Sequence, residues 1–147
     1  MLALRQLSVA DAELTAALHR VSGALIPGYD TSLHSLAEDL DFHRTKVLVE
    51  NEVWGAFEGG ELLGFIAWQP GWIDHLYVRP DRLRQGIGSV LITLPQQYQD
   101  ELRLYTFQSN ARGRAFYERH GFEIEEMTDG ERNEEKMPDI TYLWLAG

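Results

Sequence analysis

The sequence predicts an α/β fold in which a mixed, mostly antiparallel sheet of about six or seven strands carries helices on both faces. Three observations predict this fold. Short apolar runs of strand length are separated by hairpin signals, of which Gly59-Gly60 is the clearest. Longer runs show helical periodicity and begin at residues that can cap a helix. In the second half of the chain the two kinds of run alternate, which is typical of helices that cover both faces of a mixed sheet.

Each element follows from these signals in chain order. Strands are expected at residues 3–7, 52–58, 61–68, 72–78, 102–107, 122–127 and 140–145. Helices are expected at residues 10–21, about 32–43, 89–99 and 111–120, with caps at Ser8, at Thr31 or Ser32, and at Asn110. The strands at 72–78 and 102–107 should be parallel neighbours, because a single crossover helix joins them.

Length and composition indicate one domain over residues 1–147. The chain has no cysteine, which excludes disulfides and a thiol nucleophile. Its N-terminus lacks the apolar core of a signal peptide and no apolar run approaches about 20 residues, so a cytoplasmic protein is expected. Thirteen Lys and Arg against 23 Asp and Glu give a net charge of −10, which argues against nucleic acid or an anionic membrane as a partner.

A glycine-rich turn at Gly86-Ile87-Gly88 lies between an expected strand and an expected helix. This order predicts an anion-binding site, because glycines allow close approach of the backbone and the first N–H groups of the helix are free to bind an anion. No Gly-Lys-Ser/Thr follows, so a phosphate-binding NTPase loop is not indicated. Arginines cluster near this turn and in one later segment; they favour ligand contact, although ordinary helix-end charge is the alternative. These arginines are Arg79, Arg82, Arg84, Arg112, Arg114 and Arg119.

A second motif places Gly113, Phe116, Tyr117 and His120 on one face of the last expected helix. From periodicity alone, this face can simply be part of the core.

Together the two motifs resemble the GNAT superfamily of acetyl-CoA-dependent N-acetyltransferases. The resemblance covers about the last two-thirds of the chain. It rests on Leu76-Tyr77-Val78-x-Pro80 followed by Gly86-Ile87-Gly88, and then on Asn110-x-x-Gly113-x-x-Phe116-Tyr117-x-x-x-Gly121-Phe122. Leu83 departs from the family pattern, which usually has Gln or Arg there. The segments Ile73 to Val78, Phe107 to Asn110 and Thr128 to Trp144 are also similar to a bacterial subgroup with no settled substrate.

The resemblance implies an acetyltransferase that uses acetyl-CoA as co-substrate, without a metal, and acetylates a primary amine of a small molecule or a peptide. It implies that the pantetheine arm pairs with the strand at 72–78, which should splay from the strand at 102–107. It implies cofactor contacts from Leu76, Tyr77, Val78, Leu83, Arg84, Gln85, Gly86, Ile87, Gly88, Ser89, Asn110, Gly113, Phe116 and Tyr117. Tyr117 is implied as the acid that protonates the departing thiolate.

Asp74 is the expected general base, because it lies two residues before the Leu-x-Val of the strand, where the family often has a carboxylate or histidine. Strict alternation would place Trp72, Asp74, Leu76 and Val78 on one face, and Ile73, His75 and Tyr77 on the other. His75 therefore ranks second. A solvated carboxylate is the alternative for Asp74.

An ordinary solvated helix face is the favoured explanation for His34, Glu38 and Asp39, and lining of the acceptor cleft is the alternative. The acidic stretch at residues 123–139 is expected to be a solvated loop, or to attract a cationic amine. A non-catalytic acyl-CoA-binding module of the same fold is the competing function. Exposed hairpin edges make a homodimer possible.

Overall fold

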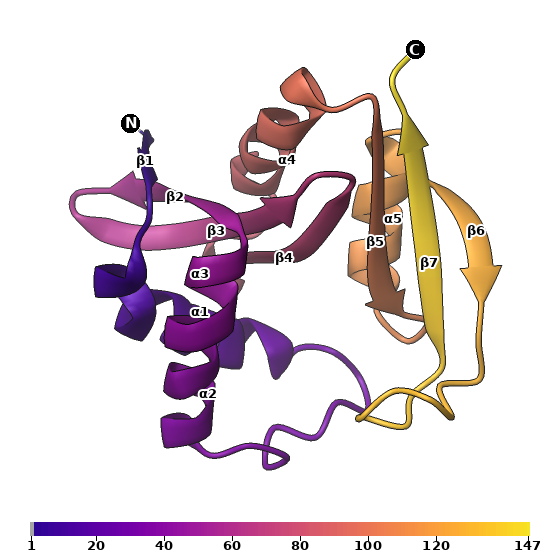
Figure 1. Cartoon of the computed structure of the whole chain (residues 1–147), viewed down its shortest axis with the longest axis horizontal. Helices are drawn as coiled ribbons and strands as arrows, with labels where there is room; N and C mark the ends of the chain where they lie inside the picture. The colour runs from indigo at the N-terminus through magenta and orange to yellow at the C-terminus, as the bar shows by residue number, and fades with distance from the viewer. Residues whose placement is uncertain (1) are drawn as a thin grey trace.

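The computed structural model describes residues 2–147 and contains one seven-stranded sheet, ordered β1-β2-β3-β4-β5-β7-β6 (Figure 1). The strands are β1 Ala3–Gln6, β2 Glu52–Glu58, β3 Glu61–Gln69, β4 Trp72–Val78, β5 Glu101–Phe107, β6 Glu123–Met127 and β7 Asp139–Leu145. Every neighbouring pair is antiparallel except β4 and β5, which are parallel. The mixed, mostly antiparallel sheet predicted from the sequence is confirmed.

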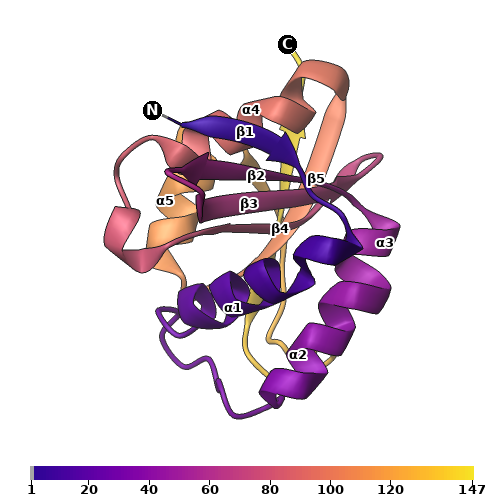
Figure 2. The same cartoon turned by 90° about the vertical axis from the view of Figure 1, so that its left-hand side faces the viewer.

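Helices cover both faces of this sheet (Figure 2). They are α1 Ala12–Gly23, α2 Leu36–Phe42, α3 Leu48–Glu50, α4 Ile87–Tyr98 and α5 Ala111–Arg119, with short turns η1 Val9–Asp11 and η3 Pro80–Arg82 and the π-helical turn η2 His43–Val47. One core cluster joins α4 and α5 to the sheet through Ile87, Leu91 and Phe116. A second cluster joins α1 and the α2–η2–α3 segment to the opposite face through Leu18 and Val47.

The start of the second helix was predicted wrongly. It begins after Ser35, not after Thr31 or Ser32. Ser35 Oγ accepts a bond from Glu38 N at 3.1 Å, and Glu38 Oε1 accepts one from Ser35 N at 2.9 Å, which together form a capping box. Ser32 instead bonds the carboxylate of Asp30 within the loop. The helical path also runs past His43, through η2 and α3, because Val47 and Leu48 are buried against the sheet.

Candidate active site

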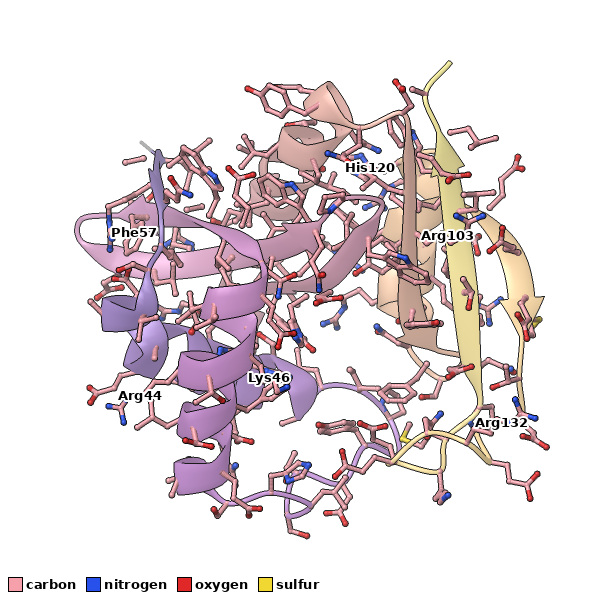
Figure 3. All side chains as sticks on the ribbon, viewed as in Figure 1. Arg44, Lys46, Phe57, Arg103, His120 and Arg132 are labelled. Carbon is pink, nitrogen blue, oxygen red and sulfur yellow. The ribbon has the colours of Figure 1, made fainter. Side chains whose placement is uncertain are left out.

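The sheet opens between its two parallel strands. β4 pairs with β5 at a single position, Trp72 with Arg103, and Gly71 O accepts a bond from Arg103 N at 2.8 Å. Beyond this point β4 stays paired with β3 and β5 with β7, so that the two strands run apart (Figure 1). The side chain of Arg103 (Figure 3) forms an ion pair with Glu125 of β6, in which Nε and Oε1 are 2.8 Å apart. The predicted splay is confirmed, and it leaves a free backbone edge on β4 in the middle of the sheet.

A row of unpaired amides lies beside this opening. None of the backbone N–H groups from Leu83 to Ser89 donates to an acceptor within residues 2–147, and the first bond of α4 is Val90 N to Gly86 O at 3.0 Å. Gly86 has φ +81°, in the left-handed region that favours glycine, and a Cβ there would meet nothing within 4 Å. Free N–H groups at the start of a twelve-residue helix suit an anion.

Two of the arginines near this loop are used inside the protein. Arg82 bonds Glu58 at 3.0 Å and Gln85 at 2.8 Å, and Arg79 bonds Glu61 and Asp81. Arg84 is exposed, has φ 64° and has no ion-pair partner within residues 2–147. Of the three, Arg84 is therefore the side chain left available to an anion.

In the later arginine cluster, too, one side chain bonds within the protein and the other two are exposed. Arg114 bonds the carbonyl of Gln108 at 3.3 Å and the hydroxyl of Tyr142 at 3.4 Å. Arg112 and Arg119 are exposed and make no ion pair within residues 2–147.

The start of α5 and its packing against α4 depend on Gly88, Asn110 and Gly113. A Cβ on Gly88 would lie 3.0 Å from the Phe116 ring, so glycine lets α4 and α5 come together. Asn110 caps α5 by accepting from Gly113 N at 3.2 Å and donates to Thr106 Oγ1 at 3.1 Å. A Cβ on Gly113 would collide with the Asn110 side chain.

Tyr117 lies on the inner side of α5, packed against the core cluster. Its ring centroid is 5.9 Å from that of Phe122 and 6.1 Å from that of Tyr142. Its hydroxyl has no hydrogen-bond partner within residues 2–147. Burial raises the pKa of Tyr117 well above its usual value, so the hydroxyl keeps its proton at neutral pH and is available as a donor.

A β-bulge in β4 overturns the predicted face assignment. Ala67 pairs with His75 and Trp68 with Ile73, which leaves Asp74 without a partner on β3. Ile73 therefore packs in the same cluster as Leu76 and Val78 rather than on the side of His75 and Tyr77. Asp74 is exposed and accepts a bond from Gln69 Nε2 at 2.9 Å.

Asp74, His75 and Tyr77 line one cavity of about 580 Å³, together with residues of α1, α2 and the loop before β7. Placing His75 on the face away from Asp74 was wrong, because the extra residue of the bulge turns both toward this cavity. Phe107, at the end of β5, also lines it, so the cavity adjoins the opening in the sheet.

The cavity is strongly acidic. Its carboxylates are Asp30, Glu38, Asp39, Asp41, Asp74, Glu134 and Glu135. The cations in its wall are Arg20, paired with Asp39 at 2.6 Å, and Lys46 on η2 (Figure 3). His34 Nε2 lies 2.8 Å from Glu134, which joins the loop before β7 to the loop before α2. His34, Glu38 and Asp39, for which a solvated helix face was the favoured explanation, line this cavity.

Two histidines that were not predicted as site residues meet at this cavity: His19 lines it, and His43 is buried beside His19. His19 Nδ1 is 3.0 Å from His43 Nε2, and burial lowers the pKa of both to about 4. Burial also lowers the pKa of His75, whose Nδ1 is buried and has no hydrogen-bond partner within residues 2–147. The spacing of Thr15 and His19 by four residues is a sequence signal for one helix face, but their pairing with His43 depends on the tertiary fold.

A sheet opened between two parallel neighbours, with free amides at the adjoining helix, defines an α/β fold with a site for an extended, anionic ligand. Residues 49–124 match the acetyltransferase (GNAT) domain family, and the chain belongs to that family.

Known proteins are similar to this chain, some in part of the sequence and others in fold. The peptidyl-lysine N-acetyltransferase YiaC of Escherichia coli K12 is 37% identical over 76 residues, which are 51% of each chain. The chain thus spans about half the length of the curated relatives it matches. Apo YjaB from Escherichia coli has a TM-score of 0.78 at 20% identity, covering 100% of this chain and 99% of that one. The PaiA N-acetyltransferase from Thermoplasma acidophilum, solved with coenzyme A, has a TM-score of 0.73 at 23% identity and 99% coverage of both.

Across residues 2–147 no helix is both long and apolar enough to cross a bilayer. Over the same residues, no group of three or more His, Asp or Glu side chains is arranged to hold a metal ion.

Proposed function

We propose that this chain is an N-acetyltransferase that moves an acetyl group from acetyl-CoA to a primary amine of a small molecule or a peptide, with residues 1–147 as a single catalytic domain. One observation carries the proposal: the open backbone edge of β4 adjoins the free amides at the start of α4. A pantetheine arm needs backbone partners and a pyrophosphate needs donors, and both are provided side by side. The related fold of PaiA, solved with coenzyme A, supports this choice of ligand.

The pyrophosphate is assigned to the N–H groups of Leu83, Arg84, Gln85, Gly86, Ile87, Gly88 and Ser89. The pantetheine arm is assigned to the edge at Leu76, Tyr77 and Val78, where a backbone amide polarises the acetyl carbonyl. The remaining cofactor contacts are assigned to the α5 segment, at Asn110, Gly113 and Phe116. Backbone donors and the helix dipole neutralise the pyrophosphate, so we assign no metal to it.

Tyr117 is assigned as the donor to the leaving sulfur and Asp74 as the base for the incoming amine. The unpaired Tyr117 hydroxyl donates toward the sulfur as the thiolate leaves. Asp74, exposed at the bulge and in the cavity wall, takes a proton from the incoming ammonium so that its nitrogen can attack. This division puts the acid on α5 and the base on β4.

The acceptor is assigned to the acidic cavity. Its seven carboxylates against two cations favour a positively charged amine, and a field of this sign also draws such a molecule in from solution. The similarity to YiaC, a peptidyl-lysine N-acetyltransferase, supports a lysine side chain in a peptide as one form of that amine.

An amine panel tests the proposal. Purified protein is mixed with acetyl-CoA and either small polyamines and aminosugars or lysine peptides, and free thiol and acetylated amine are measured together. Equal amounts of thiol and acetylated product with at least one amine are expected. Thiol release without an acetylated product, or none with any amine, would contradict the proposal.

A further inference from the structure

Three hydrogen-bonded side chains lead from the interior of α1 to the wall of the acidic cavity. His19 Nδ1 is 3.0 Å from His43 Nε2, and His43 Nδ1 is 2.9 Å from Thr15 Oγ1. Thr15 and His43 are each 0% exposed, whereas His19 is partly exposed and lines the cavity. This row of side chains is therefore buried at Thr15, and its other end, His19, opens onto the cavity to which the acceptor is assigned.

The contacts of Thr15 give an assignment of the hydrogens on the two imidazoles. Both contacts of Thr15 Oγ1 are hydrogen bonds when its one hydrogen is donated to the carbonyl of Ala12, 3.3 Å away, and it accepts from His43, 2.9 Å away. His43 therefore carries hydrogen on Nδ1, and its bare Nε2 accepts from Nδ1–H of His19. A neutral His19 is then left with a lone pair on Nε2.

That lone pair is accessible. His19 Nε2 has no hydrogen-bond partner within residues 2–147, and it is not fully buried. The ring stacks on Tyr77 with centroids 4.5 Å apart and planes 20° apart. Tyr77 belongs to the open edge of β4. The His19 ring that carries the lone pair therefore stacks on a residue of the strand to which the acetyl group is assigned.

We propose that His19 is a further catalytic residue, whose Nε2 accepts a proton from the acceptor nitrogen after that nitrogen has attacked the thioester carbonyl. The inference rests on the proposed function. Two protons must leave the nitrogen: one from the ammonium, assigned to Asp74, which frees the electron pair for the new C–N bond, and one from the positively charged nitrogen formed by attack. The C–S bond breaks with its electrons going to sulfur. Sulfur gains one proton and one is released to solvent.

The second proton suits a weak base. An alkylammonium such as lysine holds its proton with a pKa near 10.4. After attack, the nitrogen is bonded to a carbon that carries oxygen and sulfur, and these electron-withdrawing atoms make it much more acidic. A neutral imidazole with a pKa of about 4 is a base of suitable strength for this more acidic proton.

The surroundings of His19 agree with this role. Its ring faces His43 from η2, and His75 and Tyr77 from β4, at centroid distances of 5.2, 5.2 and 4.5 Å. Burial among these groups lowers its pKa, and the charge of Asp39 on α2 acts in the opposite direction. The carboxylate thus favours the imidazolium that forms when the proton arrives. His43 and Thr15 act through His19 and are positioning residues.

Nitrogen-15 NMR of the imidazoles in the wild-type chain tests the geometry without any acceptor. Hydrogen on Nδ1 of both His19 and His43 is expected. Hydrogen on Nε2 of a neutral His19 would overturn the inference, because that atom could not accept a proton. In Thr15→Val, His43 loses its acceptor, and its Nδ1–H form should no longer be fixed.

Kinetics test the role itself. His19→Asn keeps an amide donor toward His43 and removes only the base, so kcat for thiol release should fall by roughly 10²-fold while KM for acetyl-CoA is unchanged. This loss should persist at high pH, whereas the loss in Asp74→Asn should shrink there as the free amine predominates. Added imidazole should partly restore His19→Ala and leave the wild type and Asp74→Asn unchanged.

The outcomes separate the two claims. Wild-type turnover by His19→Asn on an amine that the wild-type chain acetylates would overturn this inference and leave the proposed function intact. Failure of the wild-type chain to acetylate any amine would overturn both.

Discussion

The hydroxyl of Tyr117 has the two properties that a donor to sulfur requires. It is unpaired within residues 2–147, and it is protonated at neutral pH, since burial raises a pKa that is ordinarily near 10. The same rise limits full proton transfer, since an ordinary thiol has a pKa near 8.5 and is the stronger acid. Hydrogen-bond donation to the sulfur as its negative charge develops is therefore the larger part of the proposed role.

Tyr117→Phe removes this hydroxyl and keeps the ring that packs on Phe122 and Tyr142. Turnover should fall by roughly 10²-fold with little change in stability, measured as thiol release and by urea denaturation. Tyr98→Phe, at an exposed tyrosine at the end of α4, is the matched control and should be unchanged. Full activity in Tyr117→Phe would leave Tyr117 a core residue only.

Single residues show where sequence reasoning stops. Asp74 and His75 were identified as base candidates, yet their faces were assigned wrongly, because a bulge depends on the register with β3 and not on the residues of β4 alone. His19 and His43 are 24 residues apart in the chain and meet only when α1 packs against η2. Neither position carries a local pattern that distinguishes it from an ordinary helix residue.

At the scale of elements, β4 was predicted with its actual bounds, and its parallel pairing and separation from β5 were also predicted. These follow from strong local signals: Pro70-Gly71 before the strand, Pro80 after it and one crossover helix. The start of α2 was missed although a signal was present, because Ser35 is followed three residues later by Glu38. Three nearby hydroxyl residues could cap a helix, and only this one has the acidic partner.

Removing that cap should loosen the wall of the acidic cavity. Ser35→Ala should lower the free energy of unfolding by about 1 kcal/mol, since it removes the bond to the Glu38 amide. Ser32→Ala, whose hydroxyl bonds only Asp30 in an exposed loop, should stay within about 0.5 kcal/mol of wild type. Urea denaturation of the three proteins measures both values. Equal losses in the two variants would place the cap elsewhere.

The whole molecule should lose stability in mild acid because of its buried histidines. His19 and His43 have a pKa of about 4 in the folded chain against 6.5 in the unfolded one. Between these values the unfolded state binds more protons, so the free energy of unfolding falls as pH is lowered from 6.5 to 4. Each histidine contributes a slope of up to about 1.4 kcal/mol per pH unit. Above pH 6.5 both states are neutral at these sites and the contribution is constant.

Urea denaturation at several pH values measures this slope. His19→Asn removes one of the two groups and should make the dependence shallower between pH 4 and 6.5. A flat profile in the wild-type chain, or an equal slope in the variant, would show that these imidazoles are not held neutral by the fold.

Binding of acetyl-CoA between the α4 loop and the open edge of β4 is the central claim, and calorimetry tests it most directly. Gly86→Asp places bulk and negative charge among the free amides at a residue with φ +81°. Gly71→Asp is the matched control, because Gly71 has the same φ of +81°, equally open surroundings and a place at the opposite end of β4. Acetyl-CoA should bind the wild-type chain and Gly71→Asp alike and should not bind Gly86→Asp measurably. Unchanged affinity in Gly86→Asp, with the fold intact, would contradict the claim.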